Sequence, residues 1–170
     1  LQIEQGDFSV TFIAAGVGAF QARQLKVDGI AAYTEGHNAQ VLYSAPQPSH
    51  IAGQEVVITG EDDRALDWAI TLATNTPAAR RVSLLHRRDA FSAVPALVDK
   101  MRALCATGSL QLVIAQITGL EDKAGRLTAL HVTGTEAQTQ RLPVDTLLVY
   151  LGLSPRLGPV SHWGLDMARK

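Results

Sequence analysis

Residues 55–70 read Glu-Val-Val-Ile-Thr-Gly-Glu-Asp-Asp-Arg-Ala-Leu-Asp-Trp-Ala-Ile, and this stretch decides the fold. Residues 55–59 contain a compact run of β-branched apolar residues, which is typical of a buried parallel strand. After Gly60 the apolar residues recur at helical spacing, and we expect the helix to end before Pro77. A buried strand, a glycine and a helix in this order predict one unit of a parallel sheet.

The segments on either side extend this pattern. Residues 82–85 predict a second buried strand, and a second helix is expected from Pro95, which suits a first helical turn, to Ala106. The other strands are expected at residues 8–15, 41–43, 110–117, 127–132 and 147–151, with a hairpin turn at 122–125. The order of these elements predicts an α/β fold, in which a parallel sheet with flanking helices is joined to a small antiparallel β-meander.

Length and composition fit one globular domain with a substantial core. The chain has 170 residues, of which 46% are hydrophobic and 18% charged, and its net charge is −1. Such a charge attracts neither nucleic acid nor an anionic membrane, and no apolar run approaches the roughly 20 residues of a spanning helix. The sequence shows no secretory signal, and the single Cys105 cannot form an internal disulfide. We therefore expect a cytoplasmic protein without nucleic-acid or membrane partners.

Two glycine turns are candidates for a dinucleotide phosphate loop, and the first of them fits poorly. Gly16 and Gly18 follow a predicted strand, but Gln21 stands at the third glycine position and no apolar helix follows. Without a helix there is no positively polarised N-terminus to hold a pyrophosphate. A structural turn is therefore the better interpretation of residues 16–18.

The second turn, at Gly60, has a strand before it and a helix after it. The fingerprint requires two glycines and then Gly or Ala, at positions that correspond here to Gly60, Asp62 and Ala65. The first and third fit, whereas residues 61–63 place three carboxylates where a diphosphate would lie. Repulsion between unit charges about 4 Å apart is roughly 4 kcal/mol at an effective dielectric near 20. The helix dipole offers an anion only about 0.3 to 2 kcal/mol, so repulsion dominates unless Arg64 or another group screens it.

An alternative interpretation of these acidic residues requires no ligand. Asp and Glu in a first helical turn cap unpaired amides and complement the helix dipole. The residues alone leave both interpretations open.

The second predicted strand ends in a basic segment, His86-Arg87-Arg88. In a dinucleotide fold the tip of this strand meets the adenosine ribose. An acidic residue at this place selects a free 2′-hydroxyl, whereas arginines accept a 2′-phosphate. We interpret Arg87 and Arg88 as a 2′-phosphate site. The alternative is a solvated basic cluster, for which Asp89 offers a partner.

No other residues form a catalytic or metal-binding pattern. The five histidines show no ligand spacing, and Cys105 is expected to be a packed core thiol within the second helix. We therefore predict no catalytic residue and no metal site.

Four motifs carry a family resemblance, and they lie at residues 14–20, 60–68, 86–91 and 151–159. Their residues and order resemble the thioredoxin reductase-like ferredoxin–NADP reductases, which belong to the FAD/NAD(P)-binding pyridine nucleotide-disulfide oxidoreductase superfamily. Thioredoxin reductases proper carry a C-x-x-C redox pair in this domain. The corresponding residues 43–49 contain no cysteine, which favours the ferredoxin or flavodoxin reductase branch.

The resemblance implies a Rossmann-like NADP-binding domain at residues 39–152. Residues 1–38 would be the edge or connector of a split FAD domain, and residues 153–170 would return toward it. A hydride would pass from NADPH to FAD in the parent protein and on to a ferredoxin- or flavodoxin-type acceptor. The expected partners are thus the missing FAD domain and this acceptor, and a homodimeric parent is compatible with them. Both ends look cut, so we expect the chain alone to be inactive and to purify without flavin.

The resemblance also implies a set of cofactor-binding residues, namely Gly60, Asp63, Arg64, Ala65, His86, Arg87 and Arg88. The chain departs from the family at this site. Family members carry glycine at Glu61 and Asp62, a small hydroxyl residue at Arg64 and an arginine at Ser92. We therefore expect weakened NADPH binding. The alternative is a degenerate nucleotide fold that has a structural or partner-binding role and does not bind NADPH.

Overall fold

The computed structural model describes residues 20–36, 39–75 and 79–155. The strand expected at 8–15, the turn at 16–18 and parts of the first and last family motifs lie outside these ranges. The chain divides into two compact units, one of residues 22–153 and one of residues 1–21 and 154–170. Strands β1 (Phe20–Ala22) and β10 (Leu153–Pro155) form a two-stranded sheet at the points where the chain passes between the units.

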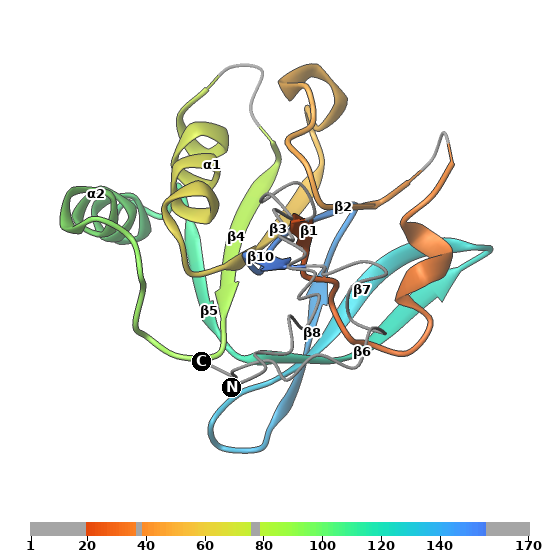
Figure 1. The fold of residues 1–170 in the computed structure, drawn as a ribbon. Helices are drawn as coiled ribbons and strands as arrows, with labels where there is room; N and C mark the ends of the chain where they lie inside the picture. Colours follow the sequence, from red (N-terminus) through yellow and green to blue (C-terminus); the bar gives the residue numbers. More distant parts are fainter. Residues whose placement is uncertain (1–19, 37–38, 76–78, 156–170) are drawn as a thin grey trace, which may run out of the picture. The chain divides into compact units, whose positions relative to one another are not determined.

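A five-stranded parallel sheet forms the centre of the larger unit, as predicted (Figure 1). Its strand order is β2-β9-β3-β4-β5, and every neighbouring pair is parallel. The strands are β2 (Val41–Leu42), β3 (Glu55–Gly60), β4 (Arg81–His86), β5 (Gln111–Ile114) and β9 (Thr146–Tyr150). The strands expected at 41–43, 55–59, 82–85 and 147–151 are thus confirmed within about one residue at each end.

Helices α1 (Asp63–Thr74) and α2 (Pro95–Ala106) pack on one face of this sheet. Their buried side chains, such as Leu66 and Met101, join alternate strand residues, such as Ile58, in one apolar core. The intervening strand residues, such as Val57, face a second core on the opposite side of the sheet. This alternation is what buried strands with both faces covered require.

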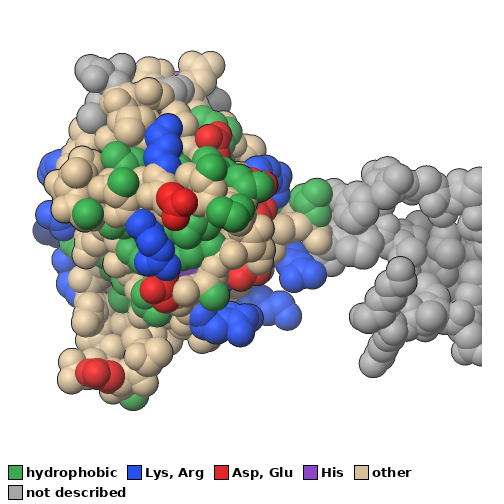
Figure 2. All heavy atoms as spheres, turned by 90° about the vertical axis from the view of Figure 1, so that its left-hand side faces the viewer, with side chains coloured by type: hydrophobic (Ala, Val, Ile, Leu, Met, Phe, Trp, Pro, Cys, Tyr) green, Lys and Arg blue, Asp and Glu red, His purple; other side chains and the backbone are tan. Residues whose placement is uncertain are grey.

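The helix-bearing face carries basic and acidic side chains that are interspersed with hydrophobic ones (Figure 2). No helix among the described residues is long and apolar enough to cross a membrane.

Strands β6 (Gln116–Lys123), β7 (Arg126–Thr133) and β8 (Thr139–Pro143) form the antiparallel meander over the second core. The expected hairpin at 122–125 is present, and its two loop residues, Ala124 and Gly125, have φ of 53° and 76°. Positive φ at both loop residues is the geometry that matches the twist of the flanking strands.

The expectation of one strand at 110–117 was wrong, because the chain forms two strands there. β5 pairs with β4 in the parallel sheet, and β6 begins the meander after Ala115. The Ala115 amide donates to the His86 carbonyl at 3.0 Å, so the end of β5 remains attached to the end of β4. Apolar residues continue through this change of sheet, and no turn residue marks it in the sequence.

Segments expected to be irregular contain two short 3-10 helices, Ile30–Tyr33 and Pro48–His50. Between them the buried side chain of Gln40 links the two sheets. Its Nε2 donates to the carbonyls of Leu127 at 2.8 Å and Asp145 at 2.9 Å, and its Oε1 accepts from the Leu127 amide at 2.8 Å. The meander and the start of β9 are therefore held to the edge of the parallel sheet.

The end of β3 lies in very close contact with β9 and α1. A Cβ atom on Gly60 would lie 2.5 Å from the Tyr150 carbonyl oxygen and 2.6 Å from the Cβ of Ala65. One of these atoms belongs to the backbone and the other is a Cβ atom, both in buried residues, so neither can move aside cheaply. Residue 60 therefore has to be glycine for reasons of space.

We expect the replacement Gly60→Ala to lower the free energy of unfolding by about 3 kcal/mol, because it overpacks this contact. The matched control is Gly119→Ala in β6, where the added Cβ would lie 3.5 Å from the nearest atom, in His131. Its expected effect is below about 1 kcal/mol. Urea unfolding of both variants measures the difference, and equal losses would contradict the packing argument.

Candidate functional site

The predicted site residues gather at the carboxyl ends of β3 and β4. Gly60 ends β3 and is in register with Tyr150, the last residue of β9, while His86 ends β4. The two connections that follow β3 and β4 are hydrogen-bonded to each other, since the Ser92 amide donates to the Glu61 carbonyl at 2.8 Å. Ligands of open α/β sheets bind outside the carboxyl ends of the strands, so this edge is where a nucleotide site belongs.

Asp62 is the N-cap of α1. Its Oδ1 accepts a hydrogen bond from the Ala65 amide at 3.0 Å, and its Oδ2 lies 3.6 Å from Nε of Arg64. The carboxylate therefore occupies the end of the helix where a pyrophosphate would otherwise meet free amides.

The neighbouring carboxylates turn away from this position. Asp63 Oδ1 accepts from the Val94 amide at 2.7 Å, which fastens the start of α1 to the start of α2. Glu61 Oε2 lies 3.2 Å from Nε2 of His86. The sequence-based expectation that all three carboxylates occupy the diphosphate position thus differs from the structure, in which the two flanking ones have partners of their own.

His86 is buried at the tip of β4, with 9% of its surface exposed. Its Nε2 is close to Glu61 but lacks the alignment of a hydrogen bond. Burial lowers the pKa of His86, the carboxylate of Glu61 opposes this effect, and the positive charges of Arg87 and Arg88 lower the pKa further. The ring is therefore neutral at pH 7 and carries a free polar nitrogen.

Arg87 and Arg88 are exposed and form no ion pair with any residue that the structure describes. Asp89, which the alternative interpretation offered as their partner, instead pairs with Arg102 of α2 at 2.7 Å. Both guanidinium groups are thus available to an anion at the strand tip.

Tyr150 was not predicted as a site residue. Its hydroxyl is buried without a hydrogen-bond partner, and Cζ of Arg64 lies 5.8 Å from the centre of its ring. Burial raises the pKa of Tyr150, so the hydroxyl stays protonated. Across the described ranges, the Tyr150 hydroxyl and His86 Nε2 are the two buried side-chain polar atoms without a partner, and both lie at this edge. The sequence signal was its position near the end of the strand predicted at residues 147–151.

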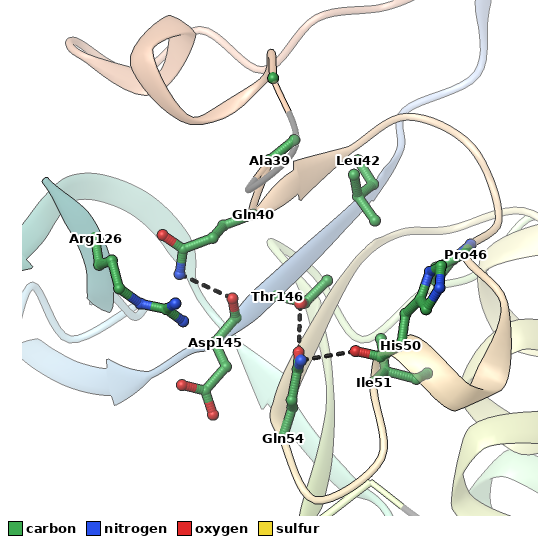
Figure 3. A pocket seen from close by; sticks show the side chains of 11 residues that line it. Ala39, Gln40, Leu42, Pro46, His50, Ile51, Gln54, Arg126, Asp145 and Thr146 are labelled. Carbon is green, nitrogen blue, oxygen red and sulfur yellow. Dashed lines mark hydrogen bonds between the residues drawn. The ribbon is translucent and has the colours of Figure 1, made fainter.

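A cavity of about 460 Å³ lies at the other edge of the sheet (Figure 3). Its lining includes polar residues that precede β2 and β3 and that precede or begin β9, namely Gln40, Gln54, Asp145 and Thr146. These polar side chains already bond within the protein, for example Thr146 Oγ1 to Gln54 Oε1 at 2.6 Å. None of the predicted site residues lines this cavity.

The remaining candidates have structural roles. Cys105 is half-buried, with its Sγ 3.7 Å from Sδ of Met101, and burial raises the pKa of its thiol. The expected packed thiol is confirmed. Within residues 20–36, 39–75 and 79–155, no group of three or more His, Cys, Asp or Glu side chains could hold a metal ion.

The lowered pKa of His86 predicts a pH dependence of stability. In the unfolded chain His86 titrates near 6.5, whereas the folded chain holds this proton more weakly. The unfolded state therefore binds more protons below pH 6.5, and the free energy of unfolding falls as the pH is lowered from 7.5 to 5.5. Urea unfolding of His86→Asn should show a flatter profile than the original chain. His50→Asn, at an exposed histidine, is the control, and an unchanged slope in His86→Asn would contradict this assignment.

Comparison with known proteins supports the family resemblance. The chain is 49% identical over 160 residues to a ferredoxin–NADP reductase of Polaromonas naphthalenivorans, covering 94% of the chain and 43% of that protein. It is also 49% identical to ferredoxin–NADP reductase 2 of Cupriavidus pinatubonensis, over 94% of the chain and 42% of that protein. No protein-family model matches the sequence.

Solved structures agree on the fold. Thioredoxin reductase of Lactococcus lactis superimposes with a TM-score of 0.71 at 19% identity, over 86% of this chain and 46% of the other. The α/β fold with its Rossmann-like parallel sheet is therefore confirmed. The chain spans less than half the length of the curated relatives that it matches. It has the fold of the thioredoxin reductase-like proteins, and it is homologous to the matching segment of the ferredoxin–NADP reductases.

Proposed function

We propose that this chain is the NADP(H)-binding domain of a FAD-dependent reductase. In the parent protein a hydride would pass from NADPH to FAD, and electrons would pass on to a ferredoxin- or flavodoxin-type acceptor. The observation that carries this proposal is that Arg87 and Arg88, at the tip of β4, are exposed and form no ion pair with any described residue. The relatives named ferredoxin–NADP reductase support it.

Four of the predicted site residues have a definite task in this proposal. Gly60 lets β3 approach α1, and Ala65 packs against it with no exposed surface. Arg87 and Arg88 would hold the 2′-phosphate through charge-assisted hydrogen bonds. The chain supplies no acid or base, because hydride transfer belongs to the nicotinamide and the flavin.

Two buried polar atoms at the site have no hydrogen-bond partner among the described residues, and a bound nucleotide would account for them. Buried side-chain polar atoms normally have a hydrogen-bond partner, and those that lack one call for an explanation such as a bound group. Nε2 of His86 and the hydroxyl of Tyr150 lie at the edge where Gly60, Arg87 and Arg88 are found. A nucleotide at this edge is one group that would satisfy them.

The proposal includes weakened binding of NADPH, because the Asp62 carboxylate already neutralises the N-terminus of α1. It also retains the predicted division into residues 1–38, 39–152 and 153–170 and a cytoplasmic location. Asp62 equally favours a second candidate, a nucleotide fold that has kept a structural or partner-binding role without NADPH.

Titrating NADPH into the complete FAD-containing reductase, while following bleaching of the flavin absorbance, tests the proposal. We expect NADPH to reduce the flavin, whereas the 170-residue chain alone purifies without flavin. A complete protein whose flavin NADPH never reduces would support the second candidate. A yellow chain with stoichiometric flavin would contradict the domain assignment.

A nucleotide preference gives a sharper test of the strand tip. We expect NADP⁺ to bind about 10-fold to 100-fold more tightly than NAD⁺, because charge-assisted bonds to the 2′-phosphate contribute about 1.5 to 3 kcal/mol. Ser92, in place of an arginine, favours the lower end. Replacing Arg87 and Arg88 together by Ala should abolish the preference and leave NAD⁺ binding nearly unchanged, as measured by calorimetry at two salt concentrations.

Arg80 and Arg81, at the other end of β4, provide the matched control. Their replacement by Ala also removes two positive charges, here from arginines that pair with Glu55, and it should preserve the preference for NADP⁺. If the Arg80/Arg81 variant lost the preference for NADP⁺ over NAD⁺ as fully as the Arg87/Arg88 variant, the preference would reflect general surface charge.

A further inference from the structure

We propose that this site holds its nucleotide by the 2′-phosphoadenosine end alone, so that adenosine 2′-phosphate binds about as tightly as NADP⁺. The inference rests on the proposed function and narrows its ligand from a dinucleotide to a 2′-phosphorylated adenosine nucleotide. It follows from the contrast between the two halves of the site.

The pyrophosphate half is filled by the chain itself. The Asp62 carboxylate accepts the Ala65 amide hydrogen at 3.0 Å and lies beside Arg64, so the helix N-terminus and its nearest cation already have an anion. A second anion at this place would have to share these partners with a carboxylate of the same sign.

Asp62 is also held in position on both sides. The preceding residue, Glu61, accepts from the Ser92 amide at 2.8 Å through its carbonyl, and the following residue, Asp63, accepts from the Val94 amide at 2.7 Å. These two links hold the backbone on both sides of Asp62, and turning the Asp62 carboxylate away from a pyrophosphate would break its cap bond to the Ala65 amide. The Asp62 carboxylate is thus held by the folded loop at the place that a pyrophosphate would take.

The adenosine half of the site is open by contrast. Arg87 and Arg88 are exposed and unpaired among the described residues, and Asp89 is engaged by Arg102. His86, at the same strand tip, is nine-tenths buried, and its Nε2 has no hydrogen-bond partner among the described residues, although Oε2 of Glu61 lies 3.2 Å away. A phosphate on the ribose would therefore meet two arginines that form no ion pair with any carboxylate of the described residues.

Calorimetry on the full chain with four ligands tests the proposal, namely NADP⁺, NAD⁺, adenosine 2′-phosphate and adenosine 5′-phosphate. We expect the Kd values of NADP⁺ and adenosine 2′-phosphate to agree within about threefold. The two ligands without a 2′-phosphate should bind at least about tenfold more weakly.

The variant Asp62→Asn separates charge from capping, because asparagine is also a good N-cap and retains the oxygen that Ala65 needs. We expect it to tighten NADP⁺ binding about tenfold and to leave adenosine 2′-phosphate unchanged. Asp67→Asn removes the same charge from an exposed position of α1 and should change neither affinity. Urea unfolding of the variants confirms that both remain folded.

The outcomes separate this inference from the proposed function. NADP⁺ binding more than about 30-fold tighter than adenosine 2′-phosphate would overturn the inference and leave the proposed NADP(H) domain standing. Equal tightening of both ligands by Asp62→Asn would also overturn it. If neither ligand with a 2′-phosphate binds to the original chain or to Asp62→Asn, the proposed function fails, and the inference that rests on it fails too.

Discussion

The close contact at Gly60 is the constraint on which the rest of the site depends. The backbone of β3 passes so near to Tyr150 and Ala65 that no side chain fits between them. This contact fixes the first turn of α1 directly above the ends of β3 and β9. Because α1 starts there, the Asp62 cap, the Arg64 side chain over Tyr150 and the bond from Val94 to Asp63 all take their positions from one glycine.

The acidic loop shows how three like charges can lie in sequence without mutual conflict. Each carboxylate has a different neighbour, since Glu61 faces His86, Asp62 caps the helix and Asp63 accepts the Val94 amide. The Glu61 contact leads to the last residue of β4, and the Asp63 contact leads to the connection that follows β4. The loop therefore joins the two segments that would enclose a nucleotide, and its charges stabilise the protein's own structure before any ligand arrives.

Sequence patterns predicted the parallel sheet and both helices well because their signals are local. The bounds of α2 match the expected residues 95–106, since Pro95 marks its start and helical spacing continues to Ala106. β8 was not predicted because residues 139–143 are mostly polar and exposed, and only Leu142 is buried. The apolar run at 110–117 gave no sign of its change of sheet, because apolar residues continue from β5 through Ala115 into β6 and no turn residue separates the two strands.

For the site, the sequence predicted which segments meet but not how their charges are arranged. The parallel register of β3 with β4 brings Gly60 and His86 together at the carboxyl ends of these strands, as the motifs indicated. The partner of Asp63 is a backbone amide 31 residues away, which no pattern within the loop reveals. The same holds for Asp89, whose pairing with Arg102 depends on how α2 lies.

The position of β9 has a consequence for how this protein forms during synthesis. β9 lies between β2 and β3, although its residues follow their partners in these strands by 90 to 106 positions, and Gln40 bonds to a carbonyl 105 residues away. The sheet therefore cannot close until nearly the whole domain has left the ribosome. Such high contact order slows folding, and the apolar edges of β2 and β3 stay uncovered on the nascent chain until the last strand inserts between them.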